Sequence, residues 1–131
     1  MASEREVEYL GIEDLVDLTV RVLGDPSPIR DFGLLGSAAA RPQTTVFGED
    51  AYPDLWTKPA ALLQSIVKSH PLVDGNKRLG WVATAVFLEI NGVAASLAPN
   101  EDVYALVMDV AAGDHSIEKI ALWLRRLARG G

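Results

Sequence analysis

One segment of the chain, residues 79–90, constrains the fold most strongly, because it would be apolar on nearly every face of a helix. Its larger apolar side chains are Leu79, Trp81, Val82, Val86, Phe87, Leu88 and Ile90. A surface helix keeps a polar face, whereas a helix that is apolar all round has to be covered on all sides. The pattern therefore predicts a buried central helix that begins near Asn76 and ends at Asn91, before Gly92.

Amphipathic stretches on both sides of this segment predict five further helices. They span residues 12–23, 32–39, 57–69, 101–112 and 117–128, with Asp31, Thr57, Asn100 and Ser116 as the expected caps. Pro71 disfavours helical backbone at the residue before it, so His70 is expected at a helix end.

A short stretch that favours β structure interrupts this helical pattern. Thr44, Thr45, Val46 and Phe47 precede Gly48, and the run is too short to form the core of a sheet. An extended flap or a small hairpin is expected there. The chain as a whole is predicted to be an all-α domain of about six helices around a buried central helix, with a small β-like flap.

Composition restricts the class of protein. With 131 residues, 49% apolar and 23% charged, the chain is expected to form a single domain over residues 1–131, with its core in about 9–127. The absence of cysteine excludes disulfides and thiolate metal sites, and no apolar run is long enough for a membrane span. The start of the sequence lacks the apolar core of a secretory signal, which favours a cytoplasmic location. A net charge of −6 argues against general nucleic-acid binding.

Nine consecutive residues at the start of the central helix carry the groups that a phosphate site needs. They read His70-Pro71-Leu72-Val73-Asp74-Gly75-Asn76-Lys77-Arg78. The histidine can accept a proton near pH 7, and a carboxylate such as Asp74 suits a Mg²⁺ ion that also binds phosphate oxygens. Arg78 offers a planar fork to phosphate, Lys77 offers a point charge, and the helix start adds free N–H groups. Gly75 permits a close backbone approach, and Asn76 can cap the helix or present its amide to a phosphate.

Each of these residues also has an ordinary explanation. A histidine after a helix is more often structural or exposed than catalytic, Asp-Gly is a common turn, and asparagine is a common helix cap. Their concentration in nine residues before a buried helix favours the functional interpretation. Lys68 adds a third cation nearby, whereas the second histidine, His115, has no comparable neighbours in the sequence and is expected at a helix start.

The run resembles the signature of the Fic/Doc superfamily, His-Pro-Phe-x-Asp/Glu-Gly-Asn-Gly-Arg. Its ending, Asn76-Lys77-Arg78, is similar to the Doc branch, the "death on curing" toxins. The resemblance extends to the stretches 31–35, 40–43 and 46–48 in the first half of the chain, and 87–93 and 111–113 in the second. It implies the helical Fic fold and the transfer of part of a nucleotide to a protein hydroxyl. Leu72 replaces the usual phenylalanine and is expected to pack inward.

By position, the resemblance implies a role for each residue of the motif. His70 would be the general base on the target hydroxyl, and Asp74 would hold Mg²⁺. The phosphates of the nucleotide would be bound by Gly75, Asn76, Lys77 and Arg78, the last two also taking part in catalysis. The flap of Thr44, Thr45, Val46 and Phe47 would align the target peptide by strand-like pairing.

Two departures from the usual signature favour one activity within this superfamily. Lys77 stands where members that transfer AMP have a glycine that opens an anion-binding nest, and Trp81 stands where many have a second arginine. By resemblance, the first change accompanies a reversed nucleotide, so the expected activity is a Doc-like kinase that moves the γ-phosphate of ATP to a Ser or Thr hydroxyl. The resemblance also implies elongation factor Tu as the cytosolic target, growth arrest as the result, and a small antitoxin as a partner.

Two other functions stay open. One is AMP or other nucleotidyl transfer to a protein hydroxyl, and the other is a non-catalytic binding domain that keeps the motif as a folding element. Movement of label from the γ or the α position of ATP separates a kinase from a nucleotidyl transferase. The chain carries no recognisable inhibitory Fic-type helix, so restraint by the antitoxin is expected in trans.

Overall fold

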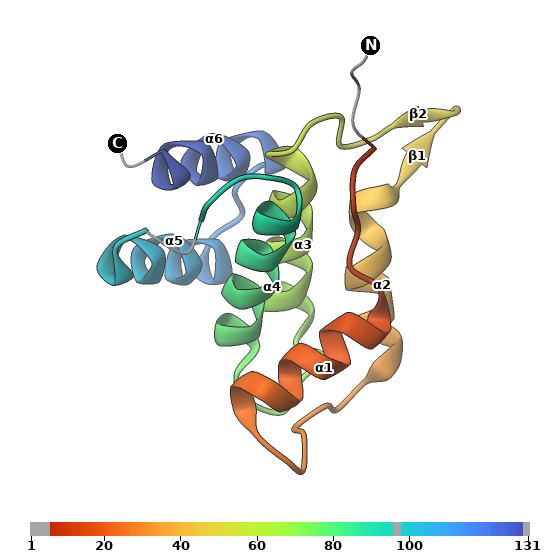
Figure 1. Ribbon diagram of the computed structural model, residues 1–131, viewed down its shortest axis with the longest axis vertical. Coiled ribbons are helices and arrows are strands. Elements are labelled where there is room, and N and C mark those ends of the chain that lie inside the picture. Colours follow the sequence, from red (N-terminus) through yellow and green to blue (C-terminus); the bar gives the residue numbers. More distant parts are fainter. Residues whose placement is uncertain (1–5, 96–97, 130–131) are drawn as a thin grey trace.

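The computed structural model describes residues 6–95 and 98–129 and shows six α-helices with one β-hairpin (Figure 1). The helices are α1 (Ile12–Leu23), α2 (Phe32–Ala40), α3 (Thr57–Ser69), α4 (Asn76–Ile90), α5 (Asn100–Ala112) and α6 (Ile117–Ala128). A 3₁₀ turn, η1 (Arg41–Gln43), leads to the strands β1 (Thr45–Val46) and β2 (Glu49–Asp50). The prediction of an all-α fold with a small β-like flap is confirmed. In the described ranges, no helix is long and apolar enough to cross a membrane.

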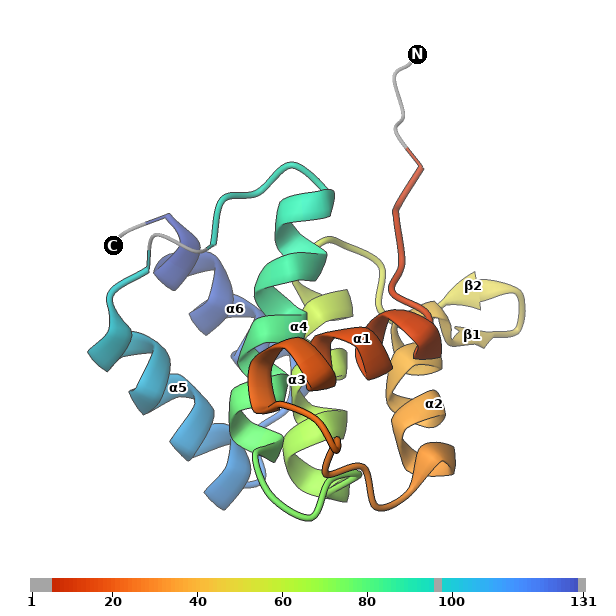
Figure 2. The same cartoon turned by 60° about the horizontal axis from the view of Figure 1, so that its bottom comes forward.

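Helices α3 and α4 lie side by side in the middle of the molecule, with α1 and α2 on one side and α5 and α6 on the other (Figures 1 and 2). Two clusters of buried side chains form as a result. From α3, Leu62 and Ile66 belong to the cluster shared with α1, α2 and α4, whereas Leu63 and Val67 belong to the cluster shared with α5 and α6. The pair of helices α3 and α4 therefore lies between the two clusters that make up the core.

The central helix α4 is covered less completely than its sequence predicts. Its buried apolar residues include Leu79, Ala83, Phe87 and Leu88, but Trp81 and Val82 are only half-buried, and Ile90 is 44% exposed. Complete burial was therefore the wrong expectation for part of the helix. Helix α5 covers Trp81 and Val82 only in part and leaves a hollow between the two helices, whereas Ile90 is the last residue of α4 and does not line this hollow.

Two of the predicted caps are confirmed. The Asp31 carboxylate accepts a hydrogen bond of 3.0 Å from the N–H of Leu34 and begins α2. The Ser116 hydroxyl accepts one of 3.1 Å from the N–H of Lys119 and begins α6. Both bonds satisfy N–H groups that have no partner inside their helix.

The other two predicted caps are wrong. Thr57 is the first residue of α3, and its N–H donates to the carboxylate of Asp54 at 2.7 Å, so Asp54 supplies the capping group. Asn100 is likewise the first residue of α5, which follows Pro99 and has no side-chain cap. A carboxylate three residues before a helix can reach its first N–H, and in α3 the Thr57 hydroxyl in return accepts from the N–H of Asp54 at 3.2 Å.

The predicted flap is a hairpin that projects from the body of the molecule beside the end of α2 (Figures 1 and 2). Val46 pairs with Glu49 in antiparallel register, and Phe47 and Gly48 form the two-residue turn. Thr44 lies just before the first strand, where its carbonyl accepts a bond of 2.8 Å from the N–H of Ala51.

Candidate active site

The candidate active site is built on the loop that joins α3 to α4. Helix α3 ends at Ser69, and His70 takes up a left-handed backbone conformation with φ of 57°. This agrees with the expectation that Pro71 would end the helix before His70. The histidine side chain is exposed, and its Nδ1 atom lies 3.4 Å from Nδ2 of Asn76. A contact of this length does not fix which ring nitrogen carries the proton.

A strand-like segment from the first half of the chain, residues 28–31, holds this loop in place. The N–H groups of Arg30 and Asp31 donate to the carbonyl of Pro71 at 2.9 and 3.0 Å. The N–H of Val73 donates to the carbonyl of Pro28 at 2.8 Å, and the guanidinium of Arg30 donates to the carbonyl of His70. Sequence reasoning missed this role of Arg30, because its partner lies 40 residues away along the chain.

Asn76 holds the loop from within. Its side-chain oxygen accepts from the N–H of Leu72 at 2.9 Å, and its amide group donates to the carbonyl of the same residue at 3.0 Å. Only 9% of Asn76 is exposed. The sequence predicted a helix cap or a phosphate contact for this amide, but Gly75 is the cap position, and both ends of the amide are engaged inside the loop. Leu72 is buried, as expected.

Gly75 and Asp74 form the turn that starts α4. Gly75 has φ of 88°, and a Cβ atom added to it would lie 2.6 Å from Cδ1 of Leu23 in α1, so this position requires glycine on two counts. The Asp74 side chain is exposed, and its Oδ1 atom accepts from the N–H of Gly75 at 2.9 Å. Among the described residues nothing bonds its other carboxylate oxygen, which stays open to a cation.

Lys77 and Arg78 lie exposed on the first turn of α4, and neither pairs with an acidic side chain in the described part of the chain. The first backbone bond of the helix runs from the N–H of Leu79 to the carbonyl of Gly75 at 2.9 Å, so three N–H groups precede it. Two free cations and free N–H groups at a helix start, on a chain of net charge −6, suit a small anion such as phosphate.

Lys68 does not join these free cations. Its ammonium group donates to the carbonyl of Gly113 at 2.6 Å and lies 3.6 Å from the carboxylate of Asp114. His115, for which no neighbours were predicted, has its Nε2 atom 2.6 Å from the carboxylate of Asp109. Both side chains stabilise the turn between α5 and α6, and this structural role accounts for them without a bound ligand.

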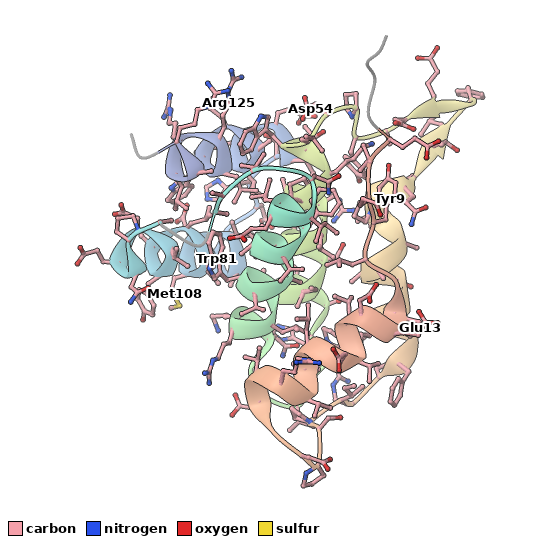
Figure 3. The ribbon with its side chains drawn as sticks, viewed as in Figure 1. Tyr9, Glu13, Asp54, Trp81, Met108 and Arg125 are labelled. Atoms are coloured by element: carbon pink, nitrogen blue, oxygen red, sulfur yellow. The ribbon has the colours of Figure 1, made fainter. Side chains whose placement is uncertain are left out.

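An apolar hollow of about 430 Å³ continues from the two free cations along α4. It is lined by Lys77, Arg78, Trp81, Val82, Asn100, Val103, Tyr104, Val107 and Met108. Figure 3 shows Trp81 and Met108 near each other, between α4 and α5. Trp81 and Val82 follow the cations by one helical turn, so a ligand whose phosphates meet the cations can place a flat apolar group in this hollow.

A second hollow, of about 610 Å³, lies between α2, η1 and α3. Its lining runs from Thr44, at the base of the hairpin, to Ser69, next to His70. Arg41 crosses it and donates to Oε1 of Gln64 at 2.8 Å and to the hydroxyl of Tyr52 at 3.0 Å. The groove therefore lies between the residue that precedes the hairpin and the last residue of α3.

The described residues contain no group of three or more histidine or carboxylate side chains that could hold a metal ion by themselves. A Mg²⁺ ion at Asp74 would therefore complete its shell with phosphate oxygens and waters, as Mg²⁺ commonly does. The open carboxylate oxygen of Asp74, beside a helix start with free N–H groups, fits such an ion.

The fold and the site together define a class of protein: an all-α domain that presents a histidine, a carboxylate and two cations at the start of its central helix. Residues 9–88 match the Fic/DOC family, and the chain belongs to that family. It is also 48% identical over 124 residues to the protein named Toxin Doc from Mycolicibacterium smegmatis, a match that covers 92% of this chain and 94% of that protein.

Proposed function

We propose that this protein is a Doc-type toxin that transfers the γ-phosphate of ATP to a Ser or Thr hydroxyl of a cytosolic protein. The observation that carries the proposal is the exposure of His70, Asp74, Lys77 and Arg78 around one helix start with free N–H groups. The similarity to a protein named as a toxin supports the biological role.

In the proposed reaction His70 accepts the proton of the target hydroxyl, whose oxygen forms a bond to the γ-phosphorus. The bond between that phosphorus and the bridging β–γ oxygen breaks, and ADP leaves. Lys77, Arg78 and the helix N–H groups stabilise the phosphate charge, and Asp74 would hold the Mg²⁺ ion that neutralises part of it. The backbone bonds from residues 28–31 keep His70 in position during the transfer.

The apolar hollow between α4 and α5 supports the orientation in which the γ-phosphate faces His70. With the adenine between Trp81 and Met108, the phosphates run back over Lys77 and Arg78 toward the loop. The end of the triphosphate then reaches the histidine before the α-phosphate does. Lys77 is a long side chain at the position where AMP-transferring relatives have glycine, which also favours this orientation.

The proposed target is elongation factor Tu, and the proposed regulator is a small antitoxin that restrains the enzyme in trans. The deciding experiment incubates the purified protein and Mg²⁺ with elongation factor Tu, once with γ-labelled and once with α-labelled ATP. We expect label from the γ position alone to reach the factor. Label from the α position would instead establish nucleotidyl transfer.

A His70→Ala variant distinguishes the two enzymatic candidates, the kinase and the nucleotidyl transferase, from a non-catalytic binding domain. We expect this variant to transfer no label and to arrest growth no longer when it is expressed. Equal growth arrest by the variant and the wild type, with no modified protein in either case, would establish the binding domain instead.

A further inference from the structure

Helix α3 carries a cationic side chain, Lys68, in its last turn, two residues before His70. The ammonium group of Lys68 donates to the carbonyl of Gly113 at 2.6 Å and lies 3.5 Å from the carbonyl of Ala111. Ala111 is in the last turn of α5, and Gly113 is the residue that caps this helix. These partners are 43 and 45 residues further along the chain, so the bond joins the end of α3 to the end of α5.

The end of α5 is a favourable partner for a cation. The last carbonyls of a helix have no N–H partner within it and lie at the negative end of its dipole. A charged donor makes a stronger hydrogen bond to such a carbonyl than a neutral donor does. Gln64, one turn earlier in α3, donates from Nε2 to the carbonyl of His115 at 3.2 Å and adds a second bond to the same turn. The carboxylate of Asp114 is 3.6 Å from Lys68 but fully exposed, so this ion pair adds little.

The turn between α5 and α6 is closely packed around the carbonyl that Lys68 binds. The Nε2 atom of His115 lies 2.6 Å from the carboxylate of Asp109, which joins the turn to the last turn of α5. A Cβ atom added to Gly113 would lie 3.0 Å from this Nε2 atom and 3.2 Å from the carbonyl oxygen of Asp109. A side chain that binds the Gly113 carbonyl is therefore held in a defined place relative to α5.

Helix α5 is also one wall of the apolar hollow in which the proposed reaction places adenine. Val107 and Met108 line this hollow, and Ala111 follows them by about one helical turn. In group transfer, a displacement of about 1 Å between the reacting groups can slow the reaction roughly a hundredfold. The bond from Lys68 thus connects the helix beside the nucleotide with the helix that ends at His70.

We propose that Lys68 is a positioning residue, which holds the end of α3, and with it His70, at a fixed distance from α5. It takes no part in the chemical step and acts through the histidine. Arg30 bonds the His70 carbonyl from the first half of the chain, so the base is held from both halves of the molecule. This inference rests on the proposed function and adds the side chain that sets the distance between the phosphate donor and the base.

The test uses Lys68→Met, because methionine keeps an apolar stem of similar length but cannot donate a hydrogen bond. We expect kcat for label transfer to the target protein to fall about fivefold while KM for ATP changes less than twofold, since a displaced base slows the chemical step. Lys68→Arg, which keeps a charged donor, should recover most of the rate. Lys119→Met is the matched control, because Lys119 is an exposed lysine of α6 that pairs with no acidic side chain in the described part of the chain.

A second measurement does not depend on activity. The chain has 2 histidines, so proton NMR at one pH gives a separate ring signal for His70 and for His115, assigned with a His115→Gln variant. We expect the His70 signal to shift or broaden in Lys68→Met and to keep its position in Lys68→Arg and Lys119→Met. Gly113→Ala, which displaces the bonded carbonyl instead of the lysine, should also change the His70 signal.

An unchanged kcat in Lys68→Met would overturn the proposal, even if the variant melts at a lower temperature, because Lys68 would then only stabilise the fold. A higher KM for ATP or for the target protein with kcat unchanged would assign Lys68 to substrate binding instead. Equal losses in Lys68→Met and Lys119→Met would also overturn it. If Lys68→Met does not fold, an unchanged His70 signal and kcat in Gly113→Ala would have the same result.

Failure of the proposed function is recognised separately. Movement of the α label of ATP would overturn the kinase but would leave the comparison of kcat between Lys68→Met and the wild type intact. Transfer of neither label by the wild type would overturn the proposed function, and the His70 signal would then decide the positioning by itself. A signal that is the same in Lys68→Met and the wild type would overturn the positioning in that case.

Discussion

Arg30 is the side chain that ties the catalytic histidine of the proposed reaction to the first half of the chain. Replacing it with glutamine removes the charged bond to the His70 carbonyl but leaves the backbone bonds to Pro71. We expect kcat for label transfer to fall about tenfold while KM for ATP changes less than twofold, since a misplaced base slows the chemical step. Arg30→Lys should recover part of the rate.

The matched control for this prediction is Arg21→Gln. Arg21 is an exposed arginine of α1 that pairs with Asp17 on the helix surface, so its loss should leave kcat unchanged. Equal losses in the two variants would show that charge alone, and not the bond to the loop, governs the rate.

Gly75 and Gly48 allow steric and conformational costs to be measured separately. Both have positive φ, but only at Gly75 would an added Cβ meet another side chain, Leu23 of α1. We expect Gly48→Ala to lower the free energy of unfolding by about 1 kcal/mol, and Gly75→Ala to lower it further by the cost of moving the Leu23 side chain. Urea denaturation of the two variants tests this, and equal losses would contradict it.

The types of residue in the motif predicted which of its side chains are exposed or buried. They did not predict which hydrogen bonds those side chains form. The positions of His70 and Leu72 follow from a proline and from hydrophobicity, which are local properties. The engagement of Asn76 with the loop, and of Lys68 with the carbonyl of Gly113, depends on groups that only the folded chain brings near. No pattern in the sequence distinguishes those side chains from free ones.

At the scale of helices, the contribution of the start of α3 to the stability of the folded protein depends on pH, because it involves the carboxyl group of Asp54. Partial burial acts to raise the pKa of Asp54, but hydrogen bonds from the backbone N–H groups of Thr57 and Trp56 outweigh it and hold the pKa below its usual value. A carboxyl with a lowered pKa stabilises the folded state above its unfolded pKa of about 3.9, and this contribution is lost as the pH falls through the folded value.

We therefore expect Asp54→Asn to be less stable than the wild type at pH 7 and to lose less further stability as the pH falls from 5 to 2. Thermal unfolding monitored by circular dichroism across that range measures both differences. Parallel pH curves for the two proteins would show that the cap does not depend on the ionised carboxylate.

The limits of the helices were predictable where a local signal marks them. Asp31 and Ser116 lie directly before an apolar periodic stretch, and both are caps in the structure. The start of α3 was assigned to Thr57 instead of Asp54, because both residue types cap well and only the backbone geometry decides between them. The partial exposure of Trp81 and Val82 in α4 was not predicted, because the spacing of apolar residues does not indicate how much of α4 is covered by α5.

At the scale of the whole molecule, α3 and α4 pack closely against each other between the two clusters of buried side chains, and Gly80 of α4 lies at their contact. A Cβ atom added to Gly80 would lie 2.8 Å from Cγ1 of Val67 and 3.2 Å from Cδ1 of Leu63. We expect Gly80→Ala to lower the free energy of unfolding by about 1–3 kcal/mol, because crowding outweighs the better helix propensity of alanine. In α2, Gly36→Ala is the control, since its Cβ would lie 3.4 Å from Ile12, and it should be neutral or stabilising.

The two core clusters have a consequence for the synthesis of the protein. Helix α3 ends at the motif loop, yet Leu63 and Val67 on α3 are covered by side chains of α5 and α6, such as Leu124. A nascent chain that has released the motif but not α6 leaves this apolar face in water, so α3, which leads into the loop, is incompletely packed. We expect ribosome-bound chains that stop at Ala112 to transfer no label from ATP, whereas complete chains released from the ribosome should show the proposed transfer. The proposed activity would then begin only when synthesis is nearly finished, which leaves time for the proposed antitoxin to bind.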